Sequence, residues 1–193
     1  VGLGLPAVFA ASALLTGLVA LLVAVGVREV RPAVIPTGST LGLAYGAVRG
    51  VVADRRVRTI FGTFALVILA NQVTRAYLPI LVEELVPPGG VLASSIALVS
   101  GVAALTGALV SPLGGALGDR IGFRPVLLGA LCGGVVALVA MPLAGSVAAL
   151  AGAALLLSAM YGVASAMTFG LVATEVAPER RSVTLNLVYL PLY

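Results

Sequence analysis

The sequence predicts an all-α fold, a polytopic bundle of helices that cross a lipid bilayer. Two observations support this prediction. The first is composition: 61% of the residues are hydrophobic and only 9% are charged, whereas a soluble domain is about a quarter charged. The second is the length of the runs that contain no charged residue, namely 1–27, 85–118 and 125–174. A helix needs roughly 20 apolar residues, at about 1.5 Å each, to cross a hydrocarbon core about 30 Å thick, and every run is long enough.

We interpret the first run, 1–27, as a membrane span and not as a secretory signal peptide. No basic segment precedes it, and it is longer than the apolar region of a signal peptide. The chain begins without methionine and ends with "LNLVYLPLY", which is apolar. We therefore expect an internal fragment of a longer protein, cut within a span at both ends.

Charged residues and helix-breaking residues divide the chain into six predicted spans. A long connector that contains Pro32 and Pro36 follows the first span. The later boundaries fall at the "PPGG" turn, the charged segment 119–124, the "MPLAGS" turn and the "EVAPERR" segment. The predicted spans are 2–27, 59–82, 90–118, 125–142, 146–174 and, truncated, 182–193.

The arginines indicate how these spans thread the membrane. Six of them lie in the connector 28–58, two in the segment 119–124 and two in 175–181. Even numbers of spans separate these connectors, so they face one compartment, and the alternate connectors contain no arginine. Because short basic loops stay cytoplasmic, we expect 28–58, 119–124 and 175–181 on the cytoplasmic side. The lack of lysine beside abundant alanine, glycine, valine and arginine indicates a GC-rich bacterial genome, and we expect the protein in the bacterial inner membrane.

The composition leaves few groups for metal or covalent chemistry. The chain has no histidine, and its one cysteine, Cys132, lies in an apolar run, where we expect a small buried side chain. No nucleophile-elbow or phosphate-loop pattern is present. We therefore expect no metal, no cofactor and no enzymatic activity.

A nucleic-acid partner is disfavoured, because the basic residues are already explained as signals that set the membrane topology. The net charge of +4 in 28–58, six arginines against Glu29 and Asp54, would suit anionic lipid headgroups.

The segment "GGALGDRIGFRP" places three charges within six positions, between long uncharged runs. The simplest interpretation is a tight turn between two spans, for which one or two charges suffice. The spacing indicates more than that. Gly115 would let the end of one span approach a neighbouring helix closely, and Gly122 permits a sharp reversal of the chain. Asp119 falls at a helix C-terminus, where a negative charge needs a positive partner.

This segment resembles the signature loop of the major facilitator superfamily, which joins the second and third helices of each six-helix half. The segment 176–182, "VAPERRS", resembles that family's cytoplasmic connector before the fifth helix of a half. The order of spans and connectors also matches, over essentially the whole chain. The resemblance implies a twelve-helix transporter, of which this chain holds the sixth helix through the start of the eleventh. Residues 1–27 would be the last span of the N-terminal half, 28–58 the central connector and 59–193 a truncated C-terminal half.

The resemblance also implies a conformational latch in this loop. Asp119 would engage the N-terminus of the span at 182–193 in one conformation and release it in the other. Phe123 departs from the family pattern, which often has a second basic residue at this place. The implied latch residues are Gly115, Asp119, Arg120, Gly122, Arg124, Arg180 and Arg181.

One charged residue lies inside a predicted span. Arg75 comes sixteen residues after Thr59, or about 24 Å along a helix, in the outer part of the span. Asn71, Thr74 and Arg75 share one helix face, and Gln72 borders it. Polar groups in a membrane favour a water-filled cavity, and in the resembled family this helix lines the central cavity. The alternative is an anchor that reaches the outer surface.

The span at 146–174 repeats this pattern. Its polar residues Ser158, Tyr161, Ser165 and Thr168 are spaced by 3, 4 and 3 and share one face. A second row, Gly162, Ala166 and Gly170, suits close helix packing. We interpret the polar row as a cavity wall. The alternative is that serine and threonine hydroxyls bond carbonyls of their own helix. The predicted substrate-binding residues are Asn71, Gln72, Arg75, Ser158, Tyr161, Ser165 and Thr168.

The resemblance implies secondary active transport by alternating access, with the chain most similar to bacterial exporters of drugs and small amphiphilic metabolites that exchange them for protons. No acidic residue lies within a predicted span, so we expect the proton-binding carboxylate in the missing N-terminal half. The expected partners are a small-molecule substrate, protons, the lipid bilayer and that half of the same chain. One alternative is an uptake permease for an organic anion that uses Arg75 as counter-charge. Another is a non-transporting membrane scaffold or lipid-modifying enzyme.

Overall fold

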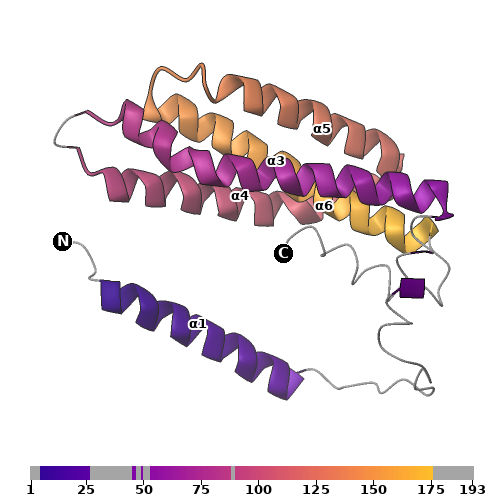
Figure 1. The fold of residues 1–193 in the computed structure, drawn as a ribbon. Helices are drawn as coiled ribbons and strands as arrows, with labels where there is room; N and C mark the ends of the chain where they lie inside the picture. The colour runs from indigo at the N-terminus through magenta and orange to yellow at the C-terminus, as the bar shows by residue number, and fades with distance from the viewer. Residues whose placement is uncertain (1–4, 27–44, 47–48, 50–52, 88–89, 176–193) are drawn as a thin grey trace. The chain divides into compact units, whose positions relative to one another are not determined.

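The computed structural model describes residues 5–26, 45–46, 49, 53–87 and 90–175. The chain forms two compact units, 1–38 and 39–193, which we describe separately. All regular structure in the described ranges is helical and no strand occurs there (Figure 1). The predicted span at 182–193, together with Arg180 and Arg181, lies outside the described residues.

The first unit contains one described helix, α1, which runs over Leu5–Gly26. Its 22 residues correspond to about 33 Å, and they fall within the span predicted at 2–27. The hydroxyl of Thr16 donates to the carbonyl of Ser12 at 2.8 Å. This bond within the helix satisfies a polar group that would otherwise need a partner in lipid.

The described part of the second unit contains four long helices: α3 at Arg55–Leu85, α4 at Leu92–Ile121, α5 at Phe123–Ala140 and α6 at Val147–Glu175. They form a bundle in which α6 packs against the other three (Figure 1). All four are long and apolar enough to cross a membrane, which confirms the predicted helical bundle. Among the described residues, α4 contacts both α3 and α5, whereas α3 and α5 do not approach each other closely.

Helix α3 begins four residues earlier than the predicted start at Thr59. The reason is a side-chain cap: a carboxylate oxygen of Asp54 accepts hydrogen bonds from the backbone N–H groups of Arg56, at 2.8 Å, and Val57, at 3.4 Å. Such a cap satisfies donors that a helix start leaves without partners. Three of the six arginines that the sequence places in the connector, Arg55, Arg56 and Arg58, therefore belong to the start of the helix.

The segment 119–124 is more helical than predicted. Asp119 belongs to the last turn of α4, and α5 begins at Phe123, so one residue separates the two helices. That residue is Gly122, with φ 98° and ψ 148°, a conformation that is essentially restricted to glycine. The prediction of a sharp reversal at Gly122 is confirmed.

Glycines bring α4 and α6 into close contact. The carbonyl oxygen of Gly107 lies against Gly162, and a Cβ added to Gly114 would meet a Cγ atom of Val163 at 2.8 Å. This confirms the predicted packing role of Gly162. Gly115 makes no such contact with the described helices: a Cβ there would meet no described atom within 4 Å, because the face of α4 that contacts α6 passes through the preceding residue, Gly114. The close approach predicted for Gly115 stays a prediction.

Phe123 packs against a notch that two further glycines form. A Cβ added to Gly118 of α4 would lie 2.9 Å from a Cδ atom of the Phe123 ring, and one added to Gly170 of α6 would lie 2.7 Å from a Cε atom. The ring therefore occupies space that any larger residue in these two places would need. This confirms the packing role predicted for Gly170 and joins three helices at one end of the bundle.

Large apolar side chains cover the outside of the second unit. Leu105, Leu109 and Leu143 are 64%, 73% and 77% exposed. Such an exterior suits hydrocarbon, which has no hydrogen bonds to offer. Cys132 is also exposed, so the prediction that it is buried is wrong. The apolar run that contains Cys132 therefore forms part of the outer surface of α5 and does not lie only in the core of the bundle.

Candidate functional site

A cavity of about 730 Å³ lies between α3, α4 and α6. Its volume falls within the range of roughly 300–1,000 Å³ that small-molecule sites occupy. Half of the residues in its wall are alanine, glycine and leucine, and all three helices contribute polar side chains. The polar residues that line it are Asn71, Thr74, Arg75, Ser100, Ser111, Ser158, Tyr161 and Ser165.

Helix α3 contributes Asn71, Thr74 and Arg75 to this cavity, so the residues that share a face in the sequence share one wall in the structure. Arg75 makes no hydrogen bond or ion pair with any residue in the described ranges. It is also the single charged side chain among the described residues that line the cavity. A guanidinium group in this position offers five N–H donors to an occupant of the cavity.

Gln72 does not line this cavity, although the sequence places it beside Asn71. Its side chain is exposed on α3. One residue along a helix turns the side chain by about 100°, which is enough to take Gln72 off the wall that Asn71 and Arg75 form.

Helix α6 contributes Ser158, Tyr161 and Ser165. The hydroxyl oxygen of Ser165 is buried and has no hydrogen-bond partner among the described residues. A buried hydroxyl without a partner is costly, so Ser165 is suited to bond a molecule in the cavity.

Thr168, the fourth member of the predicted polar row, lies elsewhere. Its side chain is 0% exposed, and its hydroxyl donates to the carbonyl of Ala164 at 2.8 Å. For Thr168 the alternative interpretation holds, since the hydroxyl is satisfied within its own helix and none of the three cavities includes the residue. We do not include Thr168 in the candidate site.

The contribution of α4 was not predicted. Ser100 and Ser111 both line the cavity. They are eleven residues apart, close to three helical turns, and therefore lie on one face. This spacing could have indicated them, but no other polar residue stands next to either serine in the sequence. The wall also contains Ala108. In a helix its backbone carbonyl would accept a hydrogen bond from the N–H of residue 112, but residue 112 is a proline, which has no N–H to donate.

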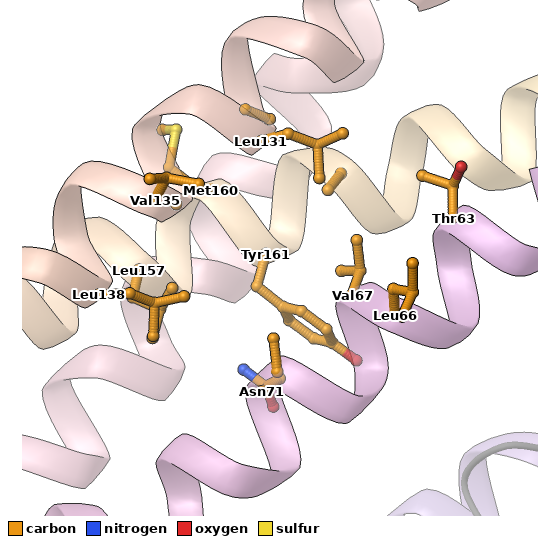
Figure 2. A pocket seen from close by; sticks show the side chains of 14 residues that line it. Thr63, Leu66, Val67, Asn71, Leu131, Val135, Leu138, Leu157, Met160 and Tyr161 are labelled. Atoms are coloured by element: carbon orange, nitrogen blue, oxygen red, sulfur yellow. The ribbon is translucent and has the colours of Figure 1, made fainter.

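A second, apolar cavity of about 400 Å³ lies on the other side of Tyr161, between α3, α5 and α6. Figure 2 shows the ring of Tyr161 extending from α6 toward α3, beside Asn71 and Val67. Tyr161 and Asn71 line both cavities. They therefore form part of the wall between a polar compartment and an apolar one.

The residues of the predicted latch are only partly described. Asp119 and Arg120 are exposed in the last turn of α4, and no described residue donates a hydrogen bond to the carboxylate of Asp119. Arg124 lines a third pocket, at the beginnings of α3 and α5. The expected partners of Asp119 lie outside the described residues, so the latch stays a prediction. Within the described residues, no group of three metal-ligating side chains occurs.

Four membrane-length helices, three of which line a solute-sized cavity with polar groups, define a polytopic membrane protein. Over residues 1–190 the sequence matches the Major Facilitator Superfamily. The chain therefore belongs to this superfamily, whose members are secondary transporters. Searches of curated proteins and of solved structures found no match.

Proposed function

We propose that the cavity between α3, α4 and α6 is the solute-binding site of a transporter that works by alternating access. The observation that supports this most is the convergence of Asn71 and Arg75 with Ser158, Tyr161 and Ser165 on one cavity, although about 80 residues separate the two groups. Tyr161 lies near the middle of α6, which runs over Val147–Glu175. A site in the middle of the bilayer is where transporters that rock two helical halves bind solute.

We propose export of small amphiphilic molecules in exchange for protons as the direction and coupling. The cavity wall is mostly apolar with scattered hydroxyl groups, and this lining suits a solute with a large apolar body and a few polar atoms. None of the described acidic side chains, Asp54, Glu83, Glu84 and Asp119, lines the cavity. A proton-binding carboxylate would therefore come from outside the described side chains, and we propose the N-terminal half of the transporter as its source.

A second candidate is transport of an organic anion, inward or outward. Arg75 favours it, because this guanidinium group lines the cavity and has no described carboxylate near it to balance its charge. A carboxylate or phosphate on the solute would supply the missing negative charge.

Transport assays in proteoliposomes distinguish the two candidates. The full-length protein, Arg75→Ala and Gln72→Ala are compared with panels of anionic and of neutral or cationic amphiphilic solutes. Gln72→Ala is the matched control, because Gln72 lies on the same helix but outside the cavity. If Arg75→Ala loses only the anions, Arg75 recognises the charge of the solute. If Arg75→Ala loses transport of every solute, Arg75 has a more general role in the cavity. Full transport by Arg75→Ala, or no transport by the unaltered protein, contradicts the proposed site.

A further inference from the structure

One backbone carbonyl in the wall of the candidate site lacks its usual helical donor. Pro112 lies inside α4 and has no N–H, so the carbonyl of Ala108 does not receive the hydrogen bond that a helix supplies from four residues later. Ala108 lines the cavity between α3, α4 and α6. No side chain of the described residues donates to this carbonyl. Because a carbonyl oxygen only accepts hydrogen bonds, this part of the wall suits a group that carries an O–H or N–H.

Two serine hydroxyls lie at the same level of the cavity. Helices α4 and α6 run in the same direction (Figure 1) and touch where the carbonyl oxygen of Gly107 lies against Gly162. Ser111 follows Gly107 by four residues, or about 6 Å, and Ser165 follows Gly162 by three, or about 4.5 Å. Both serines line the cavity. Since the backbone contact fixes α4 against α6, described residues alone set the placement of this level.

These two hydroxyls form no hydrogen bond within their own helices. The hydroxyl oxygen of Ser165 is buried without a partner among the described residues, and Ser111 makes no side-chain hydrogen bond with any of them. In contrast, Thr106 of α4 and Thr168 of α6 each donate to a carbonyl four residues earlier, at 2.8 Å. Buried polar groups are normally hydrogen-bonded. The carbonyl and the two hydroxyls therefore form a polar cluster that a bound molecule can complete.

We propose that this cluster, formed by the carbonyl of Ala108 and the hydroxyls of Ser111 and Ser165, binds a hydroxyl or amide group of the solute. The proposal rests on the solute site proposed above and narrows its solute class to molecules with a hydrogen-bond donor. A hydroxyl or amide group donates to the carbonyl and also accepts from a serine hydroxyl, whereas an ether only accepts. A bound ether would leave the carbonyl unpaired in a closed cavity, which is costly.

Protection from thiol labelling measures this preference. The full-length protein with Ser158→Cys in a Cys132→Ser background is treated in detergent with a thiol reagent while ω-phenylalkan-1-ols or their methyl ethers are added. Ser158 lines the same cavity, so an occupant should slow the reaction. Each alcohol and its ether share an apolar body and an oxygen, but only the alcohol donates. We expect the alcohol that protects best to bind roughly 5- to 100-fold more tightly than its ether.

A proline variant assigns the preference to the cluster. Pro112→Ala restores the N–H that pairs with the carbonyl of Ala108, so the ratio of alcohol to ether affinity should fall severalfold while the unfolding midpoint does not fall. Pro79→Ala is the matched control and should keep the ratio, because Pro79 also lies inside a helix but does not line the cavity. Equal protection by alcohol and ether, no protection by any alcohol, or an unchanged ratio in Pro112→Ala would overturn the proposal. The proteoliposome assay decides the solute site separately, since transport without this preference would leave that site standing.

Discussion

The carbonyl oxygen of Gly107 in α4 lies directly against Gly162 in α6, so the two helices meet backbone to backbone. A Cβ added to Gly107 would in turn lie 2.8 Å from the carbonyl oxygen of Ser158. Close approach of this kind is how helices gain packing energy in a membrane, where no hydrophobic effect drives them together. It also fixes the position of Ser158 in the cavity relative to the α4 wall.

Gly162→Leu should separate α4 from α6. The new side chain would collide with backbone, which cannot move aside as a flexible side chain can, and overpacking of this kind costs about 1–3 kcal/mol or more. Thermal unfolding in detergent should show a lower midpoint. Gly152→Leu in the same helix is the matched control, since a Cβ there meets no described atom within 4 Å. Equal midpoints for the two variants would show that the contact does not limit stability.

Ser165→Ala should weaken solute binding without harming the fold. The hydroxyl has no described partner, so its removal leaves no protein group unsatisfied. A lost hydrogen bond to solute costs about 0.5–1.5 kcal/mol, which corresponds to a KM roughly 2- to 10-fold higher. Concentration-dependent transport measures this. Thr168→Val, which removes a hydroxyl bonded within its own helix, should leave KM unchanged. A higher KM for Thr168→Val alone would refute the placement of the site.

Phe123→Ala should loosen the junction of α4, α5 and α6. The ring contacts Gly118 and Gly170, and its removal opens a void there. Because the side chain is only partly buried, we expect a loss below the roughly 3–5 kcal/mol of a fully buried phenylalanine. Chemical or thermal unfolding gives the difference. Val136→Ala on the same helix, where the side chain is 61% exposed, should change stability little, and an equal loss in both would contradict the account.

Asp119→Asn should slow the conformational cycle and leave folding intact. The substitution keeps the size of the side chain but removes the charge that the predicted latch uses. We expect turnover in proteoliposomes to fall severalfold, with an unchanged unfolding midpoint. Asp54→Asn is the control, since asparagine caps a helix about as well as aspartate. Unaltered turnover in Asp119→Asn would refute the latch.

Cysteine labelling tests the predicted threading of the membrane. In a Cys132→Ser background, Ala53→Cys and Ile121→Cys should react with a membrane-impermeant thiol reagent from the cytoplasmic face. Pro87→Cys and Gly145→Cys should react from the opposite face. All four positions are exposed at helix ends or in turns. Reaction of Pro87→Cys and Ile121→Cys from the same face would overturn the topology that the arginines predict.

The sequence predicts which side chains share a helix face, but not which face meets a neighbour. The row Asn71, Thr74 and Arg75 was predicted from spacing alone, and it lines one wall. In contrast, Gly114 and Gly115 are indistinguishable in the sequence, and only the packing of α6 shows that Gly114 makes the contact.

Local hydrogen bonds account for the other differences. Thr168 is fully buried and does not line the cavity, and its hydroxyl donates a hydrogen bond to a carbonyl of its own helix; the spacing of the polar row does not reveal this. The early start of α3 depends on the Asp54 cap. That aspartate was counted as part of the basic connector and not as a helix signal.

The central claim, alternating access to the cavity between α3, α4 and α6, is tested most directly by labelling Ser158→Cys in the Cys132→Ser background of the full-length protein. Sealed right-side-out and inside-out vesicles are treated with an impermeant thiol reagent, with Gly145→Cys as the one-sided reference. The account predicts that Ser158→Cys reacts from both faces while Gly145→Cys reacts from one. Reaction of Ser158→Cys from a single face only, or from neither, would contradict it.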